Sequence, residues 1–205
     1  MEAFKSNLTY VNQKLQLLEE RYVESAPVRV YCGTFNVNGK LPEDESLRPW
    51  LCVPCADGRP VDIYALGFQE LVDLNTKSLF MQSEGYEREA YWTARLNEDM
   101  LNEANFRPRT RYRHLCQVRM FGLFLVVYAN ARLLESKCIT QVCSGWVPTG
   151  VLDVVGNKGS VAVSMRVDES RICFVCSHLA ADTDKLEKRN ADFRSTQLKL
   201  RFQPE

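Results

Sequence analysis

The sequence lacks an excess charge of either sign, a long apolar run and a signal-like opening, and each absence excludes a class of protein. Its 26 basic and 26 acidic residues cancel, so any attraction to phosphate must be local rather than global. The longest apolar stretch, residues 121–129, is too short to cross a bilayer. Residues 1–5 lead into a polar helical pattern and not into a signal peptide, so we expect a cytosolic protein.

Histidine is scarce, whereas cysteine is not: the chain has two histidines and eight cysteines. Cys52 and Cys55, and again Cys173 and Cys176, have the spacing of metal or redox pairs. The second pair lies in a predicted strand, where residues three apart point to opposite faces. The first pair lies in a proline-rich loop without a nearby histidine. We therefore expect buried free thiols in a reducing compartment.

The remaining composition is that of a globular domain, with 205 residues of which 45% are hydrophobic. Periodicity predicts helices at 84–105 and 186–202 and a helical turn at 47–51. It predicts strands at 28–36, 61–68, 112–120, 122–128, 139–143, 160–167 and 171–177. Many strands with few helices between them indicate an α+β protein, with a mixed sheet or sandwich and helices outside.

The N-terminal segment has a helical seam that ends at Ser25-Ala26-Pro27, where proline stops the helix. The seam is formed by Phe4, Leu8, Val11, Leu15, Leu18 and Tyr22. Its heptad character is too short to establish a coiled coil. We expect a helix docked on the domain, or a linker helix from an upstream region, rather than a dimerisation element. The oligomeric state stays open.

Two asparagines, Asn36 and Asn38, follow the first predicted strand and precede Gly39. On an extended chain both amides would project to the same side. Neutral amides there can orient water, ligate a hard cation or donate to a phosphate oxygen. The alternative is that they form a turn, as Asn-Gly often does.

Glu70 follows the apolar strand at 63–68, beside Gln69. A carboxylate at the end of a strand is a plausible Mg²⁺ ligand, because Mg²⁺ prefers one or two carboxylates and keeps its waters. The alternative is a solvent-facing loop glutamate, which is the commoner fate of this residue type.

The segment 156–159 reads Gly-Asn-Lys-Gly and supplies backbone N–H groups, an amide at Asn157 and an ammonium at Lys158. Such a turn can cradle a phosphate. It is not a Walker A loop, because it lacks the spaced first glycine and a following helix. A tight connection between strands is the alternative.

His178 ends the last predicted strand, whereas His114, the other histidine, lies among arginines and is expected to be structural or exposed. A histidine at a strand end can bond a phosphate oxygen or stabilise a pentavalent transition state. A hydrogen-bonded structural role is the alternative for His178.

The joint order of these segments is more specific than any one of them. They are Thr34–Gly39, Gly67–Leu71, Gly156–Ala162, Ser177–Ala181 and Glu187–Phe193. Together they resemble the catalytic domain of the type II inositol polyphosphate 5-phosphatases, within the endonuclease/exonuclease/phosphatase superfamily. The resemblance runs from about Val28 to Phe202.

The resemblance implies a four-layer α/β sandwich in which two mixed sheets pack face to face and helices flank them. It divides the chain into an N-terminal helix or linker, 1–27, and a partial catalytic domain, 28–205. The later motifs of the family, Gly-Asp-Leu-Asn, Trp-Cys-Asp-Arg and Ser-Asp-His, do not occur in this sequence. We therefore expect a truncated domain.

The reaction implied is Mg²⁺-dependent removal of the 5-phosphate from phosphoinositides such as phosphatidylinositol 4,5-bisphosphate, or from soluble inositol polyphosphates. Glu70 matches the principal metal carboxylate of the family. Asn36 matches the asparagine close to the metal and the scissile phosphate, and Asn38 its neighbour. Asn157 and Lys158 fall in the motif that flanks the active site and are expected to bind substrate, and His178 matches the histidine that contacts the scissile phosphate.

The implied partner is the phosphorylated inositol substrate, with peripheral contact to the cytosolic face of a membrane through the lipid and no nucleic acid. One alternative is a catalytically inactive fragment or splice form that acts only through binding. A nuclease of the same superfamily is disfavoured by Ser177–Ala181 and Gly156–Gly159, and by the neutral net charge.

Overall fold

The computed structural model of this protein describes residues 2–18, 21, 23–42, 46–52, 57–72, 82–106, 109–149 and 158–204. Its strands are β1 Val30–Asn36, β2 Ile63–Gln69, β3 Tyr112–Met120, β4 Leu123–Asn130, β5 Ile139–Pro148, β6 Gly159–Val167, β7 Ser170–His178 and β8 Gln203–Pro204. Its helices are α1 Glu2–Leu17, α2 Arg48–Cys52, α3 Gln82–Met100, α4 Ala131–Glu135 and α5 Leu186–Lys199, with a 3₁₀ turn, η4, at Glu103–Asn105.

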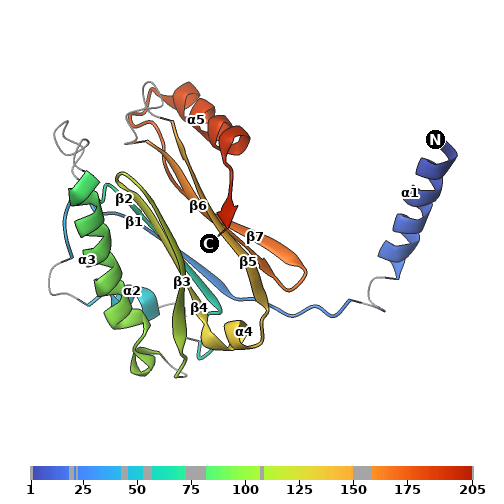
Figure 1. The fold of residues 1–205 in the computed structure, drawn as a ribbon, viewed down its shortest axis with the longest axis horizontal. Helices are drawn as coiled ribbons and strands as arrows, with labels where there is room; N and C mark the ends of the chain where they lie inside the picture. Colours follow the sequence, from blue (N-terminus) through green and yellow to red (C-terminus); the bar gives the residue numbers. More distant parts are fainter. Residues whose placement is uncertain are drawn as a thin grey trace.

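The strands form two four-stranded sheets, with the orders β1-β2-β4-β3 and β7-β6-β5-β8. Figure 1 shows α2 and α3 beside the first sheet and α5 beside one end of the second. The predicted sandwich of two packed sheets with helices outside is confirmed. The first sheet is mixed, because β1 and β2 are parallel. Every described pairing in the second sheet is antiparallel, which differs from the expectation of two mixed sheets.

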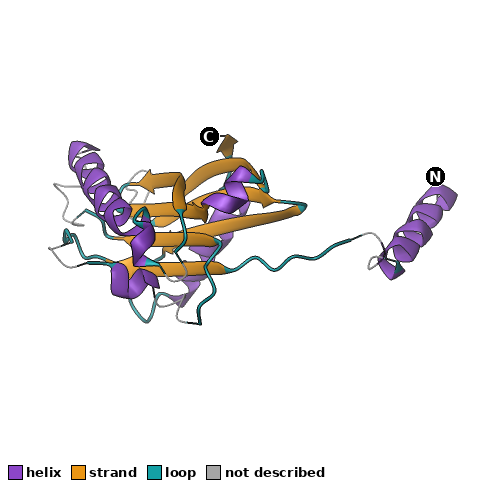
Figure 2. Ribbon diagram, turned by 90° about the horizontal axis from the view of Figure 1, so that it is seen from below, coloured by secondary structure: helices purple, strands orange, loops and turns teal. Residues whose placement is uncertain are grey.

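Two apolar layers hold these elements together, and strand periodicity assigns residues to them. On β2, Leu66 and Phe68 point to the layer under α3, where they join Trp92. The neighbouring Ala65 points to the other layer, between the sheets, where it joins Val163. Strand β4 contributes to both layers and is buried along its whole length. Seen from below, the strands run between the flanking helices (Figure 2).

Most predicted elements are present, with corrections at their ends. The C-terminal helix stops at Lys199 and not at 202, because the chain then extends and Gln203 and Pro204 pair with β5. Strand β5 continues to Pro148, five residues beyond its predicted end at Cys143. Helix α4 was not predicted; it follows β4 directly, with the Asn130 side chain accepting from the Arg132 N–H as an N-cap.

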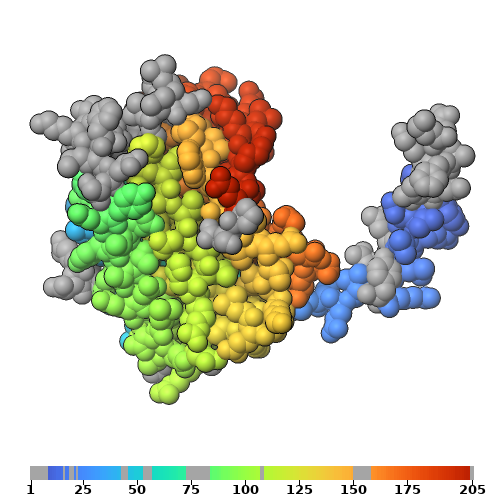
Figure 3. Space-filling model, in the orientation of Figure 1, coloured from blue at the N-terminus to red at the C-terminus, as the bar shows by residue number. Residues whose placement is uncertain are grey.

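Helix α1 is present but is not docked as one of the expectations had it. Its described apolar residues, among them Tyr10, Val11 and Leu15, are exposed. The helix stands apart from the sandwich in the space-filling view (Figure 3). No helix among the described residues is long and apolar enough to cross a membrane.

The expectation of buried free thiols holds only in part. The described cysteines are free, but Cys32 and Cys173 are exposed while Cys116 and Cys176 are buried. Cys173 and Cys176 do point to opposite faces of β7, as their spacing in a strand requires. Cys55 lies outside the described residues.

Gly159 is expected to tolerate no side chain. Its φ is +150°, and an added Cβ would lie 2.2 Å from the Val147 carbonyl oxygen and 2.7 Å from the Met120 Cε. Gly159→Ala should therefore cost about 2–4 kcal/mol of unfolding free energy in urea titrations. The control is Gly58→Ala, where φ is +77° and no heavy atom lies within 4 Å, so that only the backbone strain of about 1–2 kcal/mol is expected. Equal losses in the two variants would contradict this account.

Candidate functional site

The first half of the site lies where β1 and β2 end side by side. Because the two strands are parallel and in register, Asn36 is paired with Gln69 and Glu70 follows at the same edge. The Asn36 Nδ2 donates to the Glu70 Oε1 at 3.0 Å. The Asn36 Oδ1 accepts from the Asn38 backbone N–H at 3.0 Å. The Asn36 amide therefore orients the Glu70 carboxylate.

Glu70 is held in a backbone conformation that is uncommon for its residue type, with φ at 55°. Its carbonyl oxygen accepts from the Gly39 N–H at 2.7 Å, and the next N–H, of Leu71, donates to the Gly122 carbonyl at 2.9 Å. Such strained residues cluster at functional sites, where the surrounding structure keeps them in place. This observation favours a functional role for Glu70 over that of an ordinary loop glutamate.

The second half of the site lies where β6 begins and β7 ends. Antiparallel pairing sets Gly159 opposite His178, which places the preceding residue, Lys158, next to the imidazole. The Lys158 Nζ lies 2.6 Å from the His178 Nε2. Phosphate-binding sites commonly combine a lysine ammonium with a second donor of this kind.

The two halves meet because the sheets are packed face to face. The His178 Nε2 lies 3.5 Å from the Glu70 Oε1, and the two side chains are 14% and 20% exposed. Below them, the Gln69 Nε2 donates to the Cys176 Sγ at 3.2 Å and to the Thr34 Oγ1 at 3.0 Å. A carboxylate, an imidazole and an ammonium therefore share one partly buried cluster.

The protonation state of His178 decides which neighbour it bonds. With a neutral ring protonated at Nδ1, the Nε2 accepts a hydrogen bond from the Lys158 ammonium. With a charged ring, the Nε2 carries a proton that can be donated to Glu70 and is repelled by Lys158. An anion bound between Lys158 and His178 would favour the second state, because both cations would then face negative charge.

Burial and the nearby carboxylates shift the pKa of Lys158 in opposite directions. Desolvation lowers the pKa of the Lys158 ammonium, and the carboxylates of Glu70, Asp182 and Asp192 oppose that shift without cancelling it. Burial also raises the pKa of the Cys176 thiol to about 11, although its contacts with Gln69 and Phe68 oppose this. Cys176 is therefore a structural thiol, because a nucleophilic cysteine needs a low pKa.

Of the predicted site residues, Asn36, Glu70, Lys158 and His178 are brought together. Asn38 is placed differently from the prediction: β1 ends at Asn36, the chain turns, and Asn38 has φ at 48°, so the two amides do not project from one extended strand. Asn157 lies outside the described residues.

Sequence reasoning missed the roles of Gln69 and Asp182. The position of Gln69 directly before Glu70 was the only available signal. Nothing in the sequence marked Asp182, whose carboxylate acts on the pKa of Lys158.

The donors of this site suit a hard cation that keeps part of its water shell. The Glu70 carboxylate and the Asn36 amide oxygen are oxygen ligands of the kind that Mg²⁺ accepts, and Mg²⁺ needs few of them. Within the described ranges, no group of three or more His, Cys, Asp and Glu side chains is gathered for a metal. Glu70 and Asn36 are therefore the residues of this cluster that could hold a divalent cation.

A cavity of about 420 Å³ adjoins the site at the end of β1. Its wall includes Asn36 and Asn38 together with Lys40 and the apolar Leu41 and Trp92. Glu70, Lys158 and His178 do not line this cavity, so it adjoins the site on the side of the two asparagines.

The chain is similar to known proteins over most of its length. A family model described as endonuclease/exonuclease/phosphatase family 2 matches residues 33–205. The type II inositol 1,4,5-trisphosphate 5-phosphatase of Mus musculus is 34% identical over 194 residues, which are 95% of this chain and 18% of that protein. Phosphatidylinositol 4,5-bisphosphate 5-phosphatase INP51 of Saccharomyces cerevisiae is 27% identical over 94% of this chain and 20% of its own length.

Among solved structures, the inositol polyphosphate 5-phosphatase domain of SPsynaptojanin, in complex with inositol (1,4)-bisphosphate and a calcium ion, matches with a TM-score of 0.72. It is 28% identical, and the match covers 95% of this chain and 53% of that chain. The chain thus spans about a fifth of these two curated relatives and about half of the solved domain.

The lowered pKa of Lys158 generates a prediction for stability. At alkaline pH the folded state binds fewer protons at this residue than the unfolded state, so stability increases as pH rises. The charged side chain therefore costs stability at neutral pH, and that cost fades as pH approaches the ordinary value of 10.5. The melting temperature of the wild type, relative to that of Lys158→Met, should increase as the pH rises from neutral toward 10.5. The control is Lys137→Met, which removes an exposed lysine; an equal change in that variant would contradict the assignment to Lys158.

Proposed function

The chain belongs to the endonuclease/exonuclease/phosphatase family, and on that premise we propose that its site hydrolyses the 5-phosphate of phosphorylated inositols. The proposed substrates are phosphoinositides such as phosphatidylinositol 4,5-bisphosphate, soluble inositol polyphosphates, or both. The observation that carries the proposal is the 3.5 Å distance between the Glu70 Oε1 and the His178 Nε2. It places a carboxylate that could hold a metal beside Lys158 and His178, which could bind a phosphate. The names of the relatives support the substrate class.

Each residue has a role that follows from its chemistry. Lys158 and His178 bind the phosphoryl oxygens, and both can strengthen their contacts as negative charge accumulates there. Asn36 orients Glu70 through the 3.0 Å hydrogen bond. Glu70, with the Asn36 amide oxygen, would hold Mg²⁺, which when bound supplies a Lewis acid for the phosphoryl group. Asn38 and Asn157 are proposed to complete the substrate-facing surface.

In the reaction, a water oxygen forms a bond to phosphorus while the bond from phosphorus to the inositol oxygen breaks. The proton that water gives up is balanced by the proton that the departing inositol oxygen gains, and inorganic phosphate is released. In-line displacement of this kind needs mainly positioning and charge stabilisation. The described residues supply groups for both.

A lipid substrate would bring the protein to the cytosolic face of a membrane as a peripheral component. The neutral net charge supports headgroup recognition, rather than general attraction to anionic lipid, as the basis of that contact. A binding-only role is the second candidate.

The test is phosphate release from soluble phosphatidylinositol 4,5-bisphosphate and from inositol 1,4,5-trisphosphate, with Mg²⁺ and then with chelator. Glu70→Gln should lower Mg²⁺-dependent release by about 100-fold or more, because the metal loses its carboxylate. The matched control is Glu135→Gln, which removes an exposed carboxylate on α4, paired with Arg111.

Three outcomes are distinguishable in this assay. Release that is lost with chelator and in Glu70→Gln supports the phosphatase. Substrate binding without release, in a protein that melts cooperatively, supports the binding-only role. Hydrolysis of abasic DNA in preference to either inositol substrate would overturn both.

A further inference from the structure

An ion pair on α5, with a buried carboxylate and a half-exposed ammonium, contacts the segment that leaves the site. The Asp192 side chain is 2% exposed, and its Oδ1 lies 2.9 Å from the Lys188 Nζ, one helical turn away. Its Oδ2 accepts from the Ala180 backbone N–H at 3.0 Å. Ala180 lies two residues after His178, so one carboxylate ties α5 to the backbone that carries the imidazole.

The other member of the pair reaches the opposite side of the site. The Lys188 Nζ also donates to the Thr149 carbonyl oxygen at 3.3 Å. The Thr149 N–H in turn donates to the Lys158 carbonyl oxygen at 2.9 Å. A continuous chain of polar contacts therefore runs from the backbone of Lys158 to the backbone beside His178, through Lys188 and Asp192.

Two further sets of contacts fix α5 in this position. A hydroxyl chain links the sheet to the helix: the Ser160 Oγ lies 2.8 Å from the Ser177 Oγ and 2.9 Å from the Thr196 Oγ1. The Arg189 side chain donates to the carbonyl oxygens of Ala180 and Asp182. Because the helix is anchored independently, Asp192 presents its carboxylate from a fixed point.

We propose that Asp192, through Lys188 on one side and Ala180 on the other, is a positioning residue that sets the spacing of Lys158 and His178. The proposal rests on the proposed function in its choice of phosphate as the ligand. Asp192 does not face that ligand itself. It acts on the two backbones from which the phosphate-facing side chains project.

The cost of burying this charge supports a positioning role over simple stabilisation of the helix. Burying a carboxylate is unfavourable unless its oxygens are paired, and an exposed pair on the same helix would stabilise α5 at no such cost. Here each carboxylate oxygen has a partner, and one of these partners lies outside the helix in the chain leaving β7. A buried carboxylate whose oxygens are both paired fixes the orientation of the groups that it contacts.

The test uses the two histidines of the full chain as reporters of the site and of the rest of the fold. Ring ¹H–¹⁵N spectra are recorded for the wild type and for Asp192→Asn, and binding of inorganic phosphate is measured by calorimetry. Asp192→Asn should shift the His178 ring signals and weaken phosphate binding about tenfold, because supporting groups tune a site by roughly that factor. The signals of His114, which contacts Gln117 on β3, should not move.

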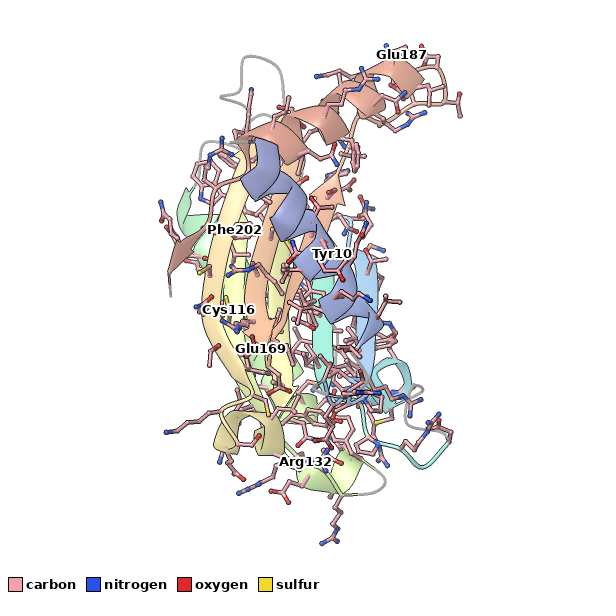
Figure 4. The ribbon with its side chains drawn as sticks, turned by 90° about the vertical axis from the view of Figure 1, so that its right-hand side faces the viewer. Tyr10, Cys116, Arg132, Glu169, Glu187 and Phe202 are labelled. Atoms are coloured by element: carbon pink, nitrogen blue, oxygen red, sulfur yellow. The ribbon has the colours of Figure 1, made fainter. Side chains whose placement is uncertain are left out.

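The matched control is Glu187→Gln, the same carboxylate-to-amide change on the same helix. Figure 4 shows Glu187 at the outer end of α5, and its side chain is exposed. This variant should leave both histidines and phosphate binding unchanged. If Asp192→Asn gives no cooperative melt, Lys188→Met tests the same link from its half-exposed end.

The outcomes separate this inference from the proposed function. A lower melting temperature with unchanged His178 signals and unchanged phosphate affinity would overturn the positioning role and leave the phosphate site intact. Wild-type protein that does not bind phosphate would overturn the proposed function, whereas the His178 signals would still decide whether Asp192 positions that ring.

Discussion

The apolar layer between the two sheets is the constraint on which the site depends. Glu70 and His178 come from different sheets, and no covalent or local contact brings them together. Residues such as Ala65, Leu125 and Val163 fill the layer, and each fully buried branched side chain contributes about 2 kcal/mol. The polar contact between Gln69 and Cys176, at 3.2 Å, is worth only about 1 kcal/mol. Packing therefore sets the distance between the half-sites, and polar contacts refine it.

The same packing lowers the stability of the folded protein at the site, because it desolvates a charged group there. Lys158 is partly desolvated where it meets His178, and the strained backbone of Glu70 is held by neighbouring turns. A protein selected for stability alone would place apolar groups here. The neutral net charge of the chain conceals this local arrangement, in which three charged or chargeable side chains share one cluster. The charged groups of the site therefore act locally, and the packed sheets of the sandwich hold them in place.

Sequence patterns predicted those elements whose periodicity is strong and whose ends are marked. The strand predicted at 112–120 matches β3, and the strands predicted at 160–167 and 171–177 match β6 and β7 to within a residue at each end. Patterns failed where tertiary pairing decides the outcome. Residues 200–202 leave the predicted helix because the chain extends there to pair Gln203 and Pro204 with β5. Asn38 turns because its N–H bonds the Asn36 side chain. The sequence placed Lys188 and Asp192 in a motif of the resemblance, Glu187–Phe193, but gave no role for either one, because their contacts with Thr149 and Ala180 join segments far apart in the chain.

By itself the sequence determined the α+β class, most of the strands and the family, because periodicity and short motifs are local properties of a chain. It also placed Asn36, Glu70, Lys158 and His178 at the ends of strands. Only the tertiary structure decided that Glu70 stands beside His178 and that α5 braces both sides of the site. The physical reason is that these contacts depend on how sheets and helices pack over long separations in sequence, and no local pattern encodes that packing.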